Sequence, residues 1–506
     1  MKKIFKTLLF TVLIFTLSGC ASSDPGKASS GNPLPQAEDT LRIAYPNDPE
    51  GLDPQRTSAV STFNITGNIY EPLLAATPDW GLSERLAESY AVSKDGLEIT
   101  FKLREGVLFH NGREMKASDV KFSFERLMES ESPKAKYYAN ISKIEENGDY
   151  EITFKTSELD VNLSLLFAYP WAVIFPEECA DELKTAPVGT GAYKFIEWTP
   201  QEKVLLTRND DYYGQKAKIK NIELKLIPDY TSQLAALKTG DVDITEITGD
   251  QIELLSLEEG FKVYSEPLNA VQLLALNMEN SILSDVRVRQ AIACAINKDD
   301  IIETTVWGYG DKIGSHIPYK SPDYVDTNGV MPYNPEKAKE LLADAGYPGG
   351  FSIKLALPKN YQIHVDAGQV IADQLSRVGI DAQIEMMEWG EWMDTVYKGK
   401  DYDMTVVALS GRLDSYDFLA RYNSGSGDFV SLITGEADSL LEAASKEADP
   451  DARKAVFAEI QNILAEKLPC VYIQTPHKMF GLSDAVEGFR IYPIDIYEYK
   501  DVSFKN

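Results

Sequence analysis

The 506-residue sequence has few of the side chains from which metal and nucleophilic sites are built. It contains only 4 Cys and 4 His, and it lacks Cys-x-x-Cys pairs, phosphate loops, G-x-S-x-G and H-E-x-x-H motifs. The four His, which are His110, His316, His364 and His477, lie far apart in the chain. We therefore predict no catalytic residue, no metal site, no cofactor and no enzyme activity.

Basic residues are also scarce, and they form no long run. Lys and Arg total 50 against 78 Asp and Glu, which gives a net charge of -28. A nucleic-acid partner is excluded because phosphate neutralisation needs a basic stripe. Charged residues at 25% and apolar residues at 44% are typical of a soluble folded body. At roughly 150 residues per domain, the length allows about three compact units.

The first twenty residues differ in composition from the rest. Lys2, Lys3 and Lys6 precede an apolar stretch at 8–17 that ends in Leu-Ser-Gly-Cys at 17–20. This pattern is typical of a signal peptide and resembles the bacterial lipobox, in which the Cys carries a lipid. We expect a signal peptide at 1–19, a lipid on Cys20 and a flexible linker at 20–39. The alternative is an ordinary signal peptide in which the Cys occurs by chance.

The remaining Cys are odd in number and widely spaced, which indicates neither a zinc site nor a disulfide framework. They are Cys179, Cys294 and Cys470. Cys294 lies in an apolar helical run and Cys470 in an apolar strand. We predict buried free thiols at these positions.

Strands and helices alternate along the body, which predicts an α/β fold. Residues 97–104 and 150–155 alternate apolar and polar side chains, as in an antiparallel sheet with one solvated face. Between them, a helix is predicted behind a Ser118 cap. Gly189-Thr190-Gly191 lacks the third Gly of a nucleotide loop and is interpreted as a tight turn.

The later half indicates a second α/β lobe. Helices are predicted from a Ser284 cap, from an Asn334 cap with Pro335 in its first turn, and over 369–378. Strands are predicted over 380–386 and over 404–409, and the second of these is interpreted as a buried parallel strand.

Several segments together resemble the peptide/nickel-binding family of extracytoplasmic solute-binding proteins. The residues that carry the resemblance are Leu-Asp-Pro at 52–54, Leu-Ala-Glu-Ser at 86–89, 101–112, 187–193, Arg-Asn at 208–209, 285–292 and 336–347. Their order and spacing cover nearly the whole chain after the signal peptide. The resemblance implies a periplasmic-binding-protein-like fold, with two α/β lobes joined by a two-crossing hinge and an extra subdomain in the larger lobe.

The resemblance also implies a division of the chain and a function. The chain is expected to cross to the second lobe near 273–277 and to return near 472–475. The expected parts are lobe 1 at 40–273 plus 475–506, a subdomain inserted at about 72–176, and lobe 2 at 274–474. The implied function is capture of a ligand, most simply a peptide, between the lobes and its delivery to the permease and ATPase subunits of an ABC importer. The expected protein is a monomer, lipid-anchored on the outer face of the bacterial cell membrane, or periplasmic where an outer membrane exists.

The resemblance implies candidate ligand-binding residues. Ser58, Ala59 and Val60 match positions that pair with a peptide backbone, a mode that ignores side-chain identity. Trp389 matches a Trp that lines the pocket, although core packing explains it equally well and is favoured for Trp392. Tyr138 is a further candidate.

The loop at 410–414 departs from the family pattern. Peptide-binding relatives place an Asp here to pair with the ligand's α-amino group, whereas the two ways of counting put Arg412 or Gly411 at that place. Asp414 is an alternative anion if the loop turns differently. A buried Arg412 would instead need a carboxylate on the ligand, while a solvated Arg412 would have no such role. The alternatives are therefore a receptor for nickel or an anionic metal chelate and, from another class, a surface hydrolase, an adhesin or a peptide-sensing receptor on the same fold.

Overall fold

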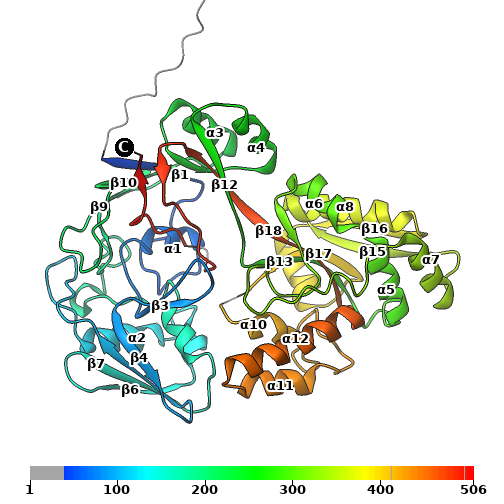
Figure 1. The fold of residues 1–506 in the computed structure, drawn as a ribbon, viewed down its shortest axis with the longest axis horizontal. Coiled ribbons are helices and arrows are strands. Elements are labelled where there is room, and N and C mark those ends of the chain that lie inside the picture. Colours follow the sequence, from blue (N-terminus) through cyan, green and yellow to red (C-terminus); the bar gives the residue numbers. More distant parts are fainter. Residues whose placement is uncertain (1–38, 412, 495, 506) are drawn as a thin grey trace, which may run out of the picture. The chain divides into compact units, whose positions relative to one another are not determined.

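The computed structural model describes residues 39–411, 413–494 and 496–505, and it confirms the predicted α/β class. Over these residues a sheet of 12 strands runs through the molecule in the order β16-β15-β17-β13-β18-β11-β1-β10-β9-β8, while β12 and β14 also pair with β18. We call the part that holds β1 lobe 1 and the part that holds β17 lobe 2 (Figure 1).

The strands of this sheet have the following bounds. In lobe 1 they are β1 (Thr40–Tyr45), β8 (Tyr193–Thr199), β9 (Lys203–Arg208), β10 (Asn221–Leu226), β11 (Ile244–Glu246) and β12 (Phe261–Pro267). In lobe 2 they are β13 (Ala270–Leu276), β14 (Gly310–Lys312), β15 (Phe351–Pro358), β16 (Ile380–Met387) and β17 (Met404–Ser410). Strand β18 (Cys470–Ser483) belongs to both lobes.

The two lobes are joined where β18 changes partners. Its first half pairs with β13 up to Gln474, and its second half pairs with β12 from His477. Strands β12 and β13 are separated only by residues 268–269, and Leu268 donates its N–H to the carbonyl of Pro476 at 2.9 Å. The first crossing therefore lies a few residues before the predicted 273–277, because Ala270 already pairs with Ser410 of β17.

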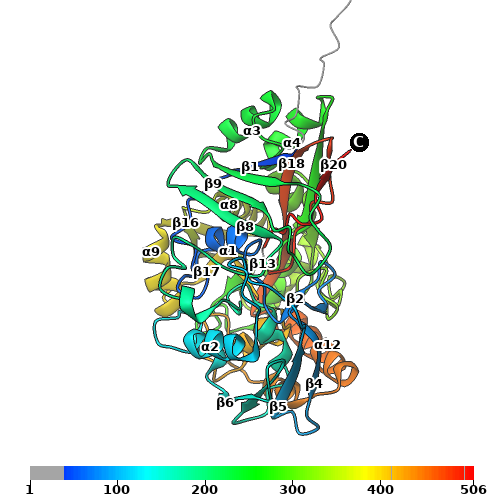
Figure 2. The same ribbon diagram turned by 90° about the vertical axis from the view of Figure 1, so that its left-hand side faces the viewer.

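A separate antiparallel sheet with the order β4-β5-β7-β6 forms the core of a subdomain in lobe 1. It lies at the end of the molecule opposite α3 and α4 (Figure 2). The predicted alternation is confirmed in β5, where Ile99, Phe101 and Leu103 are buried and Lys102 is exposed. The elements of this region are β2 (Leu74–Ala76), β3 (Leu82–Glu84), β4 (Ala87–Val92), β5 (Glu98–Leu103), α2 (Ala117–Leu127), η1 (Ala135–Tyr138), β6 (Ile141–Glu146), β7 (Glu151–Thr156) and η2 (Leu163–Ala168).

Helices and short elements complete the lobes. In lobe 1 they are α1 (Val60–Thr66), η3 (Glu177–Cys179), α3 (Tyr230–Thr239), α4 (Gly249–Ser256), β19 (Val486–Glu487) and β20 (Ser503–Phe504). In lobe 2 they are α5 (Val286–Ala295), α6 (Lys298–Val306), α7 (Pro335–Asp344), α8 (Gln362–Ser376), α9 (Trp389–Trp392), η4 (Met393–Lys398), α10 (Tyr416–Leu419), η5 (Ala420–Tyr422), α11 (Asp438–Lys446) and α12 (Pro450–Lys467).

The end of the chain returns to lobe 1, where Tyr497, Tyr499 and Val502 share a core with Leu41 and Ile43 of the first strand. Of the predicted buried thiols, Cys294 and Cys470 are buried, whereas Cys179 is half-buried. Cys20 and the expected signal peptide and linker lie outside the described residues, apart from Asp39.

Candidate functional site

Of the predicted ligand residues, Ser58, Ala59, Val60, Trp389 and Asp414 follow strands that take part in parallel pairs, and open α/β sheets bind ligands beyond the carboxyl ends of such strands. In lobe 1, β1 is parallel to β10 and β11, and the chain leaves β1 toward α1. In lobe 2, β15 is parallel to β16 and β17. Trp389 follows β16, and the 410–415 loop follows β17.

The segment before α1 presents unpaired main chain. The Ala59 N–H donates to Thr57 Oγ1 at 2.9 Å, and Thr57 donates to Glu50 Oε2 at 2.7 Å. Ser58 is exposed, and neither its N–H nor its carbonyl hydrogen-bonds to any residue that the structure describes. Val60, the first residue of α1, is 43% exposed. This segment therefore has backbone groups available for an extended ligand.

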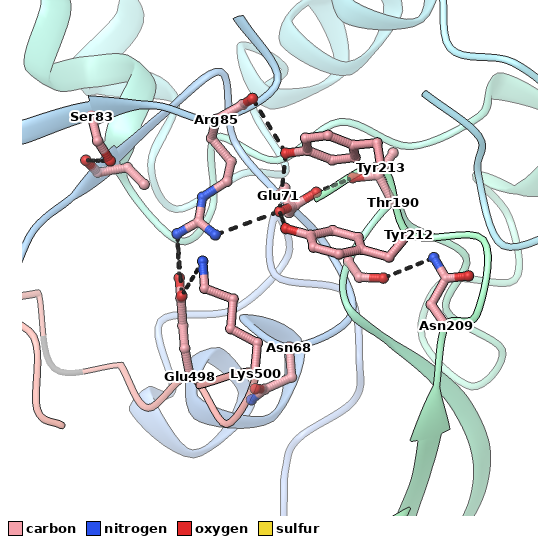
Figure 3. Close-up of polar contacts among 12 residues, drawn as sticks. Asn68, Glu71, Ser83, Arg85, Thr190, Asn209, Tyr212, Tyr213, Glu498 and Lys500 are labelled. Atoms are coloured by element: carbon pink, nitrogen blue, oxygen red, sulfur yellow. Dashed lines mark hydrogen bonds and ion pairs between the residues drawn. The ribbon is translucent and has the colours of Figure 1, made fainter. Parts of the chain in front are cut away.

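A buried ionic cluster anchors the other end of α1 (Figure 3). Asn68 donates to the carbonyl of Tyr497 at 2.9 Å, and three residues later Glu71 lies beside Arg85, with 3.6 Å between carboxylate and guanidinium. Arg85 donates to both oxygens of Glu498, at 2.9 and 3.1 Å. Sequence reasoning missed this cluster, because its members come from five separate segments.

Hydroxyl groups complete the shell of Glu71. Tyr212 donates to Oε1 at 2.7 Å, Tyr213 donates to the same oxygen at 3.3 Å, and Thr190 donates to Oε2 at 3.0 Å. Burial raises the pKa of Glu71 even though Arg85 and these donors oppose the shift. Burial also acts to raise the pKa of Glu498, but Arg85 and Lys500 outweigh it and lower that pKa. Arg85 thus carries most of the charge compensation.

The predicted tight turn at 189–191 packs against the same helix end. A Cβ on Gly189 or Gly191 would overlap the main chain of Ile69. The two glycines therefore permit a close backbone approach, which also brings Thr190 to Glu71.

Trp389 and Trp392 stack on each other in lobe 2, with centroids 5.0 Å apart and planes 7° apart. Trp392 is buried and donates its indole N–H to Thr405 Oγ1 at 3.0 Å, which confirms the prediction of core packing. Trp389 is half-buried and meets Tyr361 edge-on at 4.9 Å. Its indole packs on Trp392, and its ligand role stays a prediction.

The structure gives Asp414 a partner within the protein. Its carboxylate is 6% exposed and accepts hydrogen bonds from Arg453 at 2.9 and 3.0 Å. Asn162 of the subdomain also donates to it. A carboxylate that is already neutralised by a guanidinium is a poor anchor for a ligand amine. The substitution of Asp414 for the missing family Asp is therefore not supported by this geometry, and Arg412 lies outside the described residues.

Tyr138 lies in the subdomain core. Its side chain is 0% exposed, its hydroxyl donates to the carbonyl of Leu166 at 2.7 Å, and Trp171 donates to that hydroxyl at 3.1 Å. In this arrangement Tyr138 supports Trp171 and does not face solvent, so direct ligand contact by Tyr138 is not supported.

His477 makes a contact at the hinge that sequence reasoning did not find. Its Nδ1 lies 2.8 Å from Ser265 Oγ on β12, and its Nε2 lies 2.9 Å from Asp311 Oδ2 on β14. The three residues come from three strands that meet at the crossing. The set resembles a nucleophile–base pair in composition, and it links lobe 1 to lobe 2.

The described residues offer neither a metal site nor a membrane-spanning helix. No three His, Cys, Asp or Glu side chains in that part of the chain come together in a way that would hold a metal ion. No helix there combines the length and the apolar character needed to span a membrane.

Comparison with known proteins identifies the family. A model of the middle region of bacterial extracellular solute-binding proteins, family 5, matches residues 81–429. The chain belongs to this family. It is 24% identical to the oligopeptide-binding protein AppA of Bacillus subtilis (strain 168), over 95% of this chain and 95% of that protein.

Solved structures of this kind share the fold. HbpA2 from Haemophilus parasuis superposes with a TM-score of 0.84 at 23% identity, over 92% of this chain and 100% of that one. The ABC transporter-associated periplasmic binding protein DppA from Helicobacter pylori, in complex with the peptide STSA, superposes with a TM-score of 0.74 at 27% identity, over 92% and 98% of the two chains. The family 5 solute-binding protein therefore has the periplasmic-binding-protein-like architecture expected from its motifs.

Proposed function

We propose that this family 5 protein captures peptides between its two lobes and delivers them to an ABC importer. The observation that carries the proposal is the unpaired main chain at Ser58, next to the exposed start of α1. Backbone pairing with an extended ligand gives affinity without reading side chains. The named peptide-binding relatives support the same ligand class.

If the ligand binds the main chain of Ser58, a substitution should weaken binding only when it changes the backbone groups. Ser58→Pro removes the N–H donor and is expected to weaken peptide binding at least about ten-fold, the effect of one lost hydrogen bond to a ligand. Ser58→Ala keeps both backbone groups and is the matched control, with affinity expected within about two-fold of the parent chain. Equal losses in both variants would show that the side chain, and not the backbone, is recognised.

The ligand class is tested by what co-purifies. The protein is purified without added ligand and denatured, and the released material is analysed by mass spectrometry. Peptides of varied sequence are expected. Recovery of one non-peptidic solute contradicts the proposal, and recovery of nickel with a small carboxylate or amino-acid metallophore supports the alternative that was based on Arg412.

We assign no reaction to the protein. The Ser265–His477–Asp311 contact joins strands of the two lobes, so we interpret it as part of the hinge. Peptidase turnover that Ser265→Ala abolishes would establish the hydrolase alternative instead.

The proposed location follows from the sequence before the described residues. We propose that Cys20 carries a lipid that keeps the monomer at the outer face of the cell membrane, beside its permease and ATPase partners. Cys20→Ser is expected to release the protein from the membrane fraction. Retention of that variant in the membrane fraction would refute the lipid anchor.

A further inference from the structure

Asp414, which follows β17, is paired within lobe 2. Arg453 of α12 pairs with Asp414, and its Nε donates to the carbonyl of Ala444 at 2.9 Å. The guanidinium also lies 4.8 Å from the ring centre of Phe457. A Cβ on Gly411 would overlap the ring of Phe418. Asp414 and Gly411 are therefore in close contact with other residues of their own lobe.

Asp414 and the neighbouring Leu413 also contact lobe 1. Asn162, beside η2 of the subdomain, accepts a hydrogen bond from Arg453 Nη1 at 2.9 Å and donates to Asp414. The Leu413 N–H donates to the hydroxyl of Tyr169 at 3.1 Å, and the Leu413 side chain packs against the subdomain core. Leu413 and Asp414 therefore connect the two lobes through contacts separate from those of the hinge strands.

Asn162 has the chemistry that this bridge requires. Its amide oxygen accepts from the guanidinium, while its amide nitrogen donates to the carboxylate. The side chains of Arg453 and Asp414 are 13% and 6% exposed, so hydrogen bonds to these charges gain strength from the low local dielectric. Asn162→Ala removes both the amide oxygen and the amide nitrogen. Asn162→Asp leaves only acceptor oxygens, which lie beside the carboxylate of Asp414.

We propose that Asn162 is a positioning residue, which ties Asp414 and Arg453 of lobe 2 to the subdomain of lobe 1 and so holds the two lobes together. The inference rests on the proposed function, in which a ligand is captured between these two lobes. Ligand exchange then requires the Asn162 contacts to break before lobe 2 can move away from the subdomain.

The test measures the distance between the lobes in the full mature chain after bound ligand has been removed. Spin labels are placed at Ser142 on β6 and Ala443 on α11, both exposed, with Cys20 and Cys179 replaced by Ser. Asn162→Ala is expected to increase the population of separated lobes by roughly ten-fold or more, the effect of losing a hydrogen bond to a charged group. Asn162→Asp is expected to increase it further.

A residue swap distinguishes positioning from a local structural role. The double variant Asn162→Asp with Asp414→Asn again gives Arg453 one carboxylate and one amide, and it is expected to restore the parent distance distribution. Leu413→Ala tests the same bridge without changing Asn162, and circular dichroism checks that each variant is folded. An unchanged distribution in Asn162→Ala, or a swap variant that stays separated, would overturn the proposal. Because no ligand is used, that result would leave the peptide assignment intact.

Discussion

Removal of Arg85 is the sharpest test of how lobe 1 is held together. Arg85→Met keeps an apolar stem of similar length but leaves Glu71 and Glu498 without the guanidinium between them. The Arg85 side chain is 12% exposed, so water replaces little of the lost charge. Breaking a buried ion pair on one side costs about 3–5 kcal/mol.

The surrounding groups place the expected loss near the lower end of that range. Lys500 remains 3.2 Å from Glu498, and the hydroxyl groups of Tyr212 and Thr190 still donate to Glu71. We therefore expect Arg85→Met to lower the free energy of unfolding by about 3 kcal/mol at pH 7, a large part of the 5–15 kcal/mol typical of folded proteins. Urea unfolding followed by circular dichroism measures this loss.

The pH dependence of the stability loss in Arg85→Met provides a second, independent test. Without Arg85, the pKa values of both carboxyls in the folded protein should rise, because burial opposes their charged forms. A carboxyl whose folded pKa is raised loses stability as the pH rises through that pKa. The deficit of the variant should therefore be largest at pH 7 and shrink as the pH falls and the carboxyls become protonated.

The matched control is Arg287→Met, which removes an Arg whose side chain is 49% exposed and paired with Asp285 at 2.6 Å. Exposed ion pairs contribute about 0–1 kcal/mol. If Arg85→Met destabilises the protein no more than Arg287→Met, or if its deficit grows toward acid pH, the assignment of Arg85 as the central charge of the cluster is wrong.

Two further predictions concern lobe 2 and its contact with lobe 1. Burial lowers the pKa of His364 to about 4. Between pH 6.5 and 4 the unfolded chain therefore binds a proton on this His that the folded chain does not bind. As the pH falls through this range, the free energy of unfolding decreases by up to about 3 kcal/mol for this residue. His364→Gln should reduce the difference between urea midpoints at pH 7 and pH 4.5, and an unchanged difference would contradict this. Gly249, the first residue of α4, has no room for a Cβ because the ring of Trp307 from lobe 2 covers it. Gly249→Ala should lower the thermal midpoint, and Trp307→Ala should recover it in the double variant, whereas additive losses would show that the two residues do not interact.

Local patterns in the sequence were sufficient for most elements but not for all their ends. Asn334 caps α7 as predicted, accepting from the Lys337 N–H at 3.0 Å. The predicted Ser284 cap is wrong, because Asp285 caps α5 and Ser284 donates to the carbonyl of Ser281 instead. A carboxylate one residue later competed successfully for the free N–H groups, which hydropathy patterns do not reveal.

Two other helices begin earlier than predicted for related reasons. Asp119 accepts from the Lys116 N–H at 2.8 Å, so α2 starts at Ala117 and does not use Ser118 as its cap. Helix α8 starts at Gln362, seven residues before the predicted start, and includes buried His364 in its first turn. The Ala408 N–H donates to that ring at 3.2 Å. The part of the helix that the prediction missed therefore makes a contact with a strand 44 residues away.

Local sequence patterns could not predict whether the Asp414 carboxylate is available to a ligand. Asp414 stands in the loop where the family pattern leads one to expect an anion for the ligand, but Arg453 lies 39 residues later in α12 and pairs with it. Asn162, from the other lobe, occupies the remaining side of the pair. Whether a carboxylate can receive a ligand depends on which cation the fold brings beside it, and that cation has no fixed spacing in sequence. We therefore expect the main chain at Ser58, which has no partner among the described residues, to contribute more to ligand binding than the Asp414 carboxylate, which Arg453 already neutralises.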